Sequence, residues 1–145
     1  MKYLKDDFIV STEKSDLDIP FIHEFLTNES GWSNGIPYEL VEKSIENSLN
    51  FGLFHDNRQI GYARIISDYS TIAYLGDVFI ITEYRGLGLS KWLMEIIMNH
   101  KELQNLRRWI LVTSTAEWLY EKYGFTKLIK PEIYMEKLDT EVYKK

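Results

Sequence analysis

Two kinds of hydrophobic spacing divide the 145-residue chain into helices and strands. Apolar residues three and four apart predict helices from Pro20 to Asn28, from Pro37 to Leu49, from about Gly86 to His100 and from Ala116 to Tyr123. Short apolar runs between turn residues predict strands. These runs are Phe8–Val10, Phe51–Phe54, Gln59–Ile66, Thr71–Ile81, Trp109–Val112, Phe125–Leu128 and Tyr134–Lys137.

This order of elements favours an α/β fold with a twisted, mostly antiparallel central sheet flanked by helices. The chain has the length of one domain, and no repeat, low-complexity tract or linker interrupts it. We therefore expect a single domain over residues 1–145. Gly76, inside the longest strand run, is a candidate bulge or close-approach position.

The segment from Asp77 to Leu93 carries most of the chemical information. An apolar strand passes through Arg-Gly-x-Gly into an amphipathic helix, so several backbone N–H groups lie free at the helix start. The helix dipole and Arg85 add positive potential, which favours a phosphate or pyrophosphate there. The spacing of a P-loop is absent, and Lys91 stands where a dinucleotide fingerprint needs its third glycine. A tight turn that binds nothing remains an alternative on these residues alone.

Two motifs together resemble a known family. Arg85-x-x-Gly88-x-Ser90 is similar to the Gln/Arg-x-x-Gly-x-Gly/Ala signature of the GNAT acyltransferase superfamily. Some thirty residues later, Ala116-Glu-Trp-Leu-Tyr-Glu-Lys-Tyr-Gly-Phe125 resembles that family's second landmark. The likeness extends from about Phe51 to Lys137 and is strongest to small, single-domain bacterial members. Ser90 departs from the pattern, and its hydroxyl would either add a contact or crowd the turn.

The resemblance implies where acetyl-CoA would bind. The strands before and after the central helix would run parallel and splay apart, which opens a slot for the pantetheine arm. The backbone of Phe79, Ile80 and Ile81 would contact pantetheine, and the Ile80 N–H would polarise the thioester carbonyl. Thr113 stands where family members often carry an Asn that contacts the cofactor, and Thr can hydrogen-bond there but reaches less far. Thr115 is better placed to cap the next helix. The pyrophosphate would be held by Arg85, Gly86, Leu87, Gly88, Leu89, Ser90 and Lys91.

The same resemblance offers catalytic candidates. Tyr120 matches the tyrosine that protonates the leaving thiolate in many members, and a phenol is protonated at neutral pH. Alternatively, Tyr120 is only a core residue, because it shares one helix face with Ala116, Leu119 and Tyr123. Asp77, three residues before Ile80, is either the base for the amine or a partner for a nearby polar group. Trp32, in a Gly- and Ser-rich loop, either pins that loop to the core or lines the acceptor pocket.

The amino-acid composition excludes several kinds of site and binding partner. The chain has no cysteine, which excludes disulfides, zinc–thiolate sites and a cysteine acyl intermediate, and its three histidines lie far apart, so we expect no metal. A net charge of −5 argues against a broad nucleic-acid surface, and no stretch resembles a signal peptide or membrane span. We expect a cytoplasmic protein that binds neither nucleic acid nor membrane.

The hypothesis is therefore an acetyl-CoA-dependent N-acetyltransferase that acts on a small-molecule amine by direct transfer in a ternary complex. A non-catalytic acyl-CoA-binding or sensing module is the alternative, and an interaction domain whose glycine turn binds nothing is a third. Edge strands near the C-terminus also suggest a homodimer. An aromatic acceptor pocket would draw on Tyr3, Trp32, Tyr38, Tyr69 and Tyr74.

Overall fold

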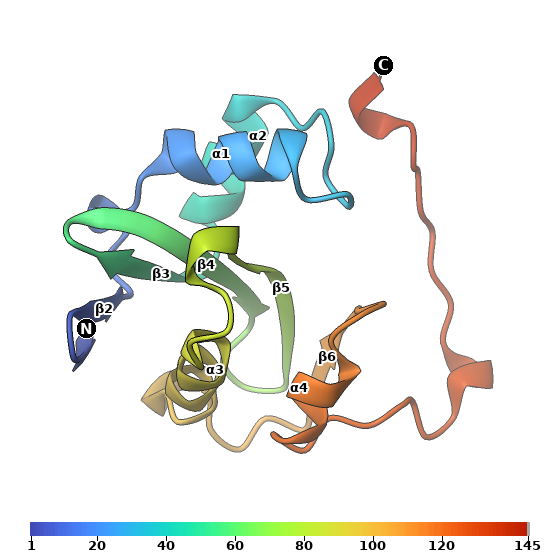
Figure 1. Ribbon diagram of the computed structural model, residues 1–145. Coiled ribbons are helices and arrows are strands. Elements are labelled where there is room, and N and C mark those ends of the chain that lie inside the picture. Colours follow the sequence, from blue (N-terminus) through green and yellow to red (C-terminus); the bar gives the residue numbers. More distant parts are fainter. Residues whose placement is uncertain (145) are drawn as a thin grey trace.

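Six strands form one sheet, in which every strand pairs with its neighbours in chain order (Figure 1). The structure is a computed structural model that describes residues 1–144. All neighbouring pairs are antiparallel except β5 and β6, which are parallel, as expected. The strands are β1 (Lys2–Lys5), β2 (Phe8–Ser11), β3 (Leu49–His55), β4 (Arg58–Ser67), β5 (Ile72–Ile80) and β6 (Arg108–Leu111).

Helices cover both faces of this sheet (Figure 1). On one face lie α1 (Ile19–Asn28), whose first turn is capped by the Asp18 carboxylate, and α2 (Tyr38–Glu46). On the other lie α3 (Leu89–Met98) and the short α4 (Glu117–Glu121). Because successive strand residues point to opposite faces, Phe79 packs with the α1–α2 cluster and Ile80 with the α3–α4 cluster. The end of β5 thus lies between two hydrophobic cores.

A bulge bends β5 before it reaches that end. Arg64 pairs with Gly76 and Tyr62 with Phe79, so one residue of β4 lies opposite the two residues Asp77 and Val78. Asp77 has a φ of +52° in this bulge. A Cβ on Gly76 would lie 2.9 Å from the Tyr74 ring, so Gly76 is the close-approach position that the sequence suggested.

The parallel pair separates halfway along. Its register runs from Ile72 opposite Arg108 to Leu75 opposite Leu111, where β6 ends. β5 continues to Ile80, so its last residues have β4 on one side and no strand on the other. This is the splayed arrangement that the family resemblance implied.

The structure corrects several boundaries. Residues 2–5 form a strand that the sequence did not indicate, joined to β2 by a turn with Asp6 at a φ of +52°. The second helix ends at Glu46 and leaves Leu49 in β3, while Leu40 on its outer side is 44% exposed. The third and fourth helices are also shorter than their hydrophobic stripes.

The last two predicted strands do not form within residues 1–144. Phe125–Leu128 and Tyr134–Lys137 pair with no strand, although both have the side-chain pattern of one. A strand needs a partner for its backbone groups, and this chain does not bring one alongside. In Figure 1 the chain after α4, coloured from orange to red, begins beside α4 and ends on the side of the α1–α2 loop, where Tyr143 lies beside Gly35.

Candidate active site

The turn before α3 exposes backbone N–H groups that no side chain within residues 1–144 caps. Gly86 and Gly88 have φ values of +82° and +78°, which residues with a side chain rarely adopt. A Cβ on either would meet no atom within 4 Å, so the space above both glycines is open. Gly88 is the N-cap, no side chain caps the helix, and its first turn holds no acidic residue. This helix start is therefore free to bind an anion.

Arg85 connects the turn to the end of β5. Its Nε donates a 2.8 Å hydrogen bond to the carbonyl oxygen of Ile80, and this leaves the two terminal nitrogens of the guanidinium for a ligand. Ser90 is half-buried in the first turn of α3, and its hydroxyl makes no hydrogen bond within residues 1–144. The Ser90 position is thus compatible with the glycine turn.

A second positive group, which the sequence analysis missed, lies at the C-terminal end of α4. Lys122 lies beside Lys91, and contact with this second ammonium lowers the pKa of Lys122 below its ordinary value. The Tyr123 hydroxyl donates a 2.9 Å hydrogen bond to the Lys91 carbonyl oxygen and fixes α4 against the start of α3. Two like charges brought together in this way favour a polyanionic ligand.

The free edge of β5 presents the Ile80 N–H. The Ile81 N–H donates to the Ile60 carbonyl in β4 at 2.9 Å. Backbone groups alternate sides along a strand, so the Ile80 N–H and C=O point the other way, toward the gap left by β6. The contact of the Ile80 oxygen with Arg85 is consistent with this direction.

Tyr120 combines a buried ring with a free hydroxyl. The residue is 8% exposed, and its ring packs edge-on against Phe125 with 6.0 Å between centroids. Burial raises the pKa of Tyr120 above 10.0. Its hydroxyl has no hydrogen-bond partner in the described chain, yet no buried side-chain oxygen there lacks a partner. The oxygen therefore still reaches solvent-accessible space, protonated and available to donate.

Thr113 serves the local structure of the loop before α4. Its Oγ1 accepts a 3.0 Å hydrogen bond from the Ala116 N–H. The cap expected from Thr115 is not observed, because Ala116 is the N-cap residue and no side chain caps α4. Thr113 thus holds the loop, and its contact with a cofactor stays a prediction.

Asp77 is engaged by two side chains from different elements. Arg64 Nε on β4 donates to Oδ2 at 2.8 Å, and Trp32 Nε1 in the α1–α2 loop donates to Oδ1 at 2.9 Å. The side chains of Arg64 and Asp77 are 18% and 11% exposed, so the ion pair is largely shielded from water. Both carboxylate oxygens are occupied, which favours the interpretation of Asp77 as a polar partner.

The same contact defines the role of Trp32. The indole pins the loop to β5 through its nitrogen, while the residue remains 55% exposed. Arg64 was missed because its strand position gave no signal. The five aromatics suggested for an acceptor pocket do not gather, since Tyr3 lies on β1 at the far edge of the sheet and Tyr69 in the β4–β5 turn.

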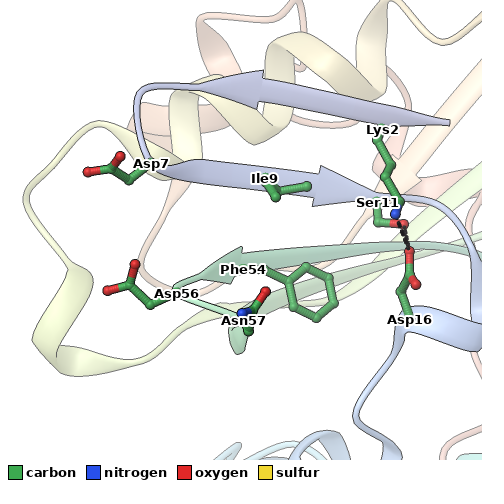
Figure 2. Close-up of a pocket in the computed structure, with 8 residues that line it drawn as sticks. All are labelled: Lys2, Asp7, Ile9, Ser11, Asp16, Phe54, Asp56 and Asn57. Carbon is green, nitrogen blue, oxygen red and sulfur yellow. Dashed lines mark hydrogen bonds and ion pairs between the residues drawn. The ribbon is translucent and has the colours of Figure 1, made fainter.

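A small hollow elsewhere on the sheet is lined partly by carboxylates. Figure 2 shows it beside β1, β2 and β3, with Lys2, Ser11 and Asp16 along one side. The Asp16 carboxylate accepts from the Ser11 hydroxyl at 2.6 Å and pairs with Lys2 at 3.6 Å. This hollow lies at the edge of the sheet opposite to β5 and β6 and does not contain the predicted site residues.

Two further properties concern residues 1–144 only. They contain no group of three or more histidines, aspartates and glutamates placed to hold a metal ion. None of their helices has the length and hydrophobicity needed to span a membrane.

Comparison with known proteins agrees with the geometry. Residues 14–145 match the Acetyltransferase (GNAT) domain family. A candidate acetyltransferase of Gibberella zeae is 28% identical over 142 residues, covering 83% of this chain and 79% of its own. A crystal structure of a candidate GNAT acetyltransferase from Xanthomonas campestris pv. campestris is 48% identical, with a TM-score of 0.93 over 95% of this chain and 97% of that one.

A more distant structure relates the fold to a ligand. A candidate acetyltransferase from Clostridium acetobutylicum, crystallised with acetyl-CoA, has a TM-score of 0.67 at 16% identity, covering 95% of this chain and 96% of that one. At this identity the likeness concerns the fold, and that fold accommodates acetyl-CoA in the other protein. The splayed strands, the glycine turn and the match over residues 14–145 lead to one conclusion: this chain belongs to the GNAT acetyltransferase family.

Proposed function

We propose that the protein transfers the acetyl group of acetyl-CoA directly to the primary amine of a small molecule, in a ternary complex. The observation that carries this proposal is the open glycine turn at the start of α3, next to the unpaired end of β5. Pyrophosphate would bind to the N–H groups of residues 86–91 and to Arg85, with Lys91 and Lys122 nearby for further phosphate charge.

The end of β5 would then hold the reacting thioester. The amine nitrogen attacks the carbonyl carbon, and the Ile80 N–H stabilises the negative charge that develops on the carbonyl oxygen. The carbon–sulfur bond breaks, and the Tyr120 hydroxyl donates its proton to the leaving thiolate. The ammonium formed by attack loses a proton to water or to a base, after which Tyr120 is reprotonated.

The remaining step is the removal of a proton from the amine. Asp77 remains a candidate, acting directly or through a water, since it lies three residues before Ile80. Its two hydrogen bonds favour a positioning role instead, in which it orients Arg64 and Trp32. The exposed indole of Trp32 offers an aromatic surface to a cationic or alkyl amine on the acceptor side.

Ligand-induced stabilisation tests the binding part of the proposal. Acetyl-CoA and CoA at about 100 times their dissociation constant should stabilise the protein by about 2.7 kcal/mol, whereas ATP should not. Arg85→Gln should abolish most of this shift. Arg58→Gln is the matched control, because Arg58 makes an exposed 3.4 Å pair with Glu83 in the neighbouring turn.

Thiol release with a panel of amines tests the transfer. Amine-dependent release of CoA supports the enzyme. Binding of CoA without turnover on any amine would favour the acyl-CoA-binding module, and no binding at all would refute the site itself.

A further inference from the structure

The β3–β4 hairpin ends in a turn whose shape is fixed by its backbone. Asp56 and Asn57 have φ values of +50° and +63°, and positive angles at both central residues define a tight type I′ turn. This turn places His55 and Arg58 directly opposite each other, as the last cross-strand pair of the two strands. Both side chains of this pair contact one segment elsewhere in the chain.

That segment is the short helix Thr82–Tyr84, which immediately precedes Arg85. The Nδ1 atom of His55 and the hydroxyl of Tyr84 are hydrogen-bonded at 2.8 Å. Phe8, the cross-strand neighbour of His55 on β2, stacks on the imidazole with 4.7 Å between ring centroids and meets the Tyr84 ring edge-on at 6.1 Å. Three rings from three segments thus hold the end of this short helix.

Two further contacts at the hairpin tip are weaker. Arg58 pairs with Glu83 at 3.4 Å, but both side chains are more than half exposed to water, where such a pair contributes little. The Asp56 carboxylate lies 3.6 Å from Nδ1 of His55, which is beyond hydrogen-bond distance, and it is 82% exposed. The His55 side chain is only 23% exposed, so its hydrogen bond with Tyr84 is the best shielded of the three contacts.

The backbone that would bind pyrophosphate is held at two points. Leu89, which is buried in the core below α3, fixes the end nearer to the helix. Tyr84 fixes the other end through the ring cluster. Between them, Gly86 and Gly88 have positive φ and no side chain to pack. The direction in which the chain leaves Tyr84 therefore sets where Arg85 and the N–H groups of the turn lie.

We propose that His55 is a positioning residue for acetyl-CoA, acting through Tyr84 on the placement of Arg85 and the glycine turn. This inference rests on the proposed function, because it concerns the site assigned there to pyrophosphate. Its hydrogen bond holds the Thr82–Tyr84 helix in the orientation that lets the Arg85 guanidinium and residues 86–91 contact pyrophosphate together. Without that bond the turn samples other orientations, and acetyl-CoA has to restrain them on binding, which lowers its affinity.

Titration calorimetry of acetyl-CoA into the full-length protein tests this role. His55→Ala should raise the acetyl-CoA dissociation constant about three- to tenfold, as expected for the loss of one hydrogen bond. The kcat at saturating acetyl-CoA should stay at the wild-type value, because no reacting group has changed. His55→Asn should restore most of the affinity, since its amide offers an acceptor and a donor near the position of Nδ1. A wild-type dissociation constant in His55→Ala would overturn the proposal.

Tyr84→Phe removes the other half of the hydrogen bond and keeps the packing of the ring. It should weaken acetyl-CoA binding by a factor similar to that of His55→Ala, and the double variant should bind no more weakly than His55→Ala alone. Additive losses would show that the two residues act separately and would refute the proposed role. Arg58→Gln is the matched control at the same hairpin tip, and it should bind acetyl-CoA as the wild type does.

A truncated cosubstrate separates positioning from general damage to the fold. S-acetylpantetheine carries the thioester but no pyrophosphate, so its kcat/KM in the thiol-release assay should be the same in His55→Ala and in the wild type. An equal loss with both cosubstrates would show that His55 only supports the fold. A wild-type protein that binds no acetyl-CoA would refute the proposed function and this role with it, whereas binding that His55→Ala leaves unchanged would refute the role alone.

Discussion

Replacing Tyr120 by phenylalanine removes one hydroxyl from the site and little else. The ring is 8% exposed and packs against Phe125, and phenylalanine keeps that packing. The hydroxyl has no hydrogen-bond partner within residues 1–144, so its loss should change the free energy of unfolding by less than about 1 kcal/mol. If the hydroxyl donates the proton to the thiolate, its loss should lower turnover by about 10² to 10⁴-fold.

The assay is steady-state thiol release at saturating amine, with the acetyl-CoA dissociation constant measured separately. Tyr120→Phe should lower kcat and leave acetyl-CoA binding unchanged. Burial raises the pKa of Tyr120 above 10.0, so the hydroxyl stays protonated at neutral and mildly alkaline pH. Wild-type kcat should therefore not fall over this pH range through loss of the Tyr120 proton.

Tyr123→Phe is the matched control. It removes a hydroxyl from the turn that follows the same helix and breaks the 2.9 Å bond to the Lys91 carbonyl. This change should cost about 1 kcal/mol of stability but leave the proton donor in place. Wild-type turnover in Tyr120→Phe, or an equal loss in both variants, would show that Tyr120 is a core residue only.

Three other changes address the rest of the structure. Gly88→Ala should cost about 1 kcal/mol and weaken acetyl-CoA binding in a titration; Gly31→Ala, at a similar φ of +80°, should cost the same and leave binding unaltered. Asp77→Asn should lower stability by about 2 kcal/mol, because it removes the carboxylate from the Arg64 ion pair and leaves Arg64 only its hydrogen bond to the Ser48 hydroxyl. An unchanged pH–rate profile in this variant would exclude Asp77 as the base. Burial raises the pKa of Tyr62 above 10.0, so its contribution to stability is complete below pH 10 and is lost as pH rises through the folded-state pKa. Above pH 10 the free energy of unfolding should therefore fall less steeply with pH in Tyr62→Phe than in the wild type, by up to about 1.4 kcal/mol per pH unit. An identical slope in the two proteins would contradict this.

The sequence predicted the elements whose cause is local. The turn before α3 follows from two glycines, which can adopt positive φ without a steric penalty, and α3 itself follows from its apolar stripe. The parallel, splayed pair did not follow from any local pattern. It was expected from the family resemblance, and the register between β5 and β6 confirms it.

Contacts between segments far apart in the chain could not be predicted from the sequence. Nothing in the composition of β4 indicated that Arg64 meets Asp77, or that Trp32 reaches the same carboxylate from 45 residues away. Lys122 likewise comes beside Lys91 only because α4 docks on α3. The C-terminal segment shows the opposite case: the two strands predicted there from the side-chain pattern were wrong, because no partner strand lies alongside them within residues 1–144.

The hydrogen bond from Arg85 to the Ile80 carbonyl bears on the order in which the two substrates bind. The residue expected to bind pyrophosphate is tied to the peptide whose N–H would face the thioester, so occupation of one end of the cosubstrate site restrains the other. An acceptor amine that arrives first would meet a strand end that pyrophosphate has not yet fixed through Arg85. We therefore expect a compulsory sequence of binding, with acetyl-CoA first and the amine second.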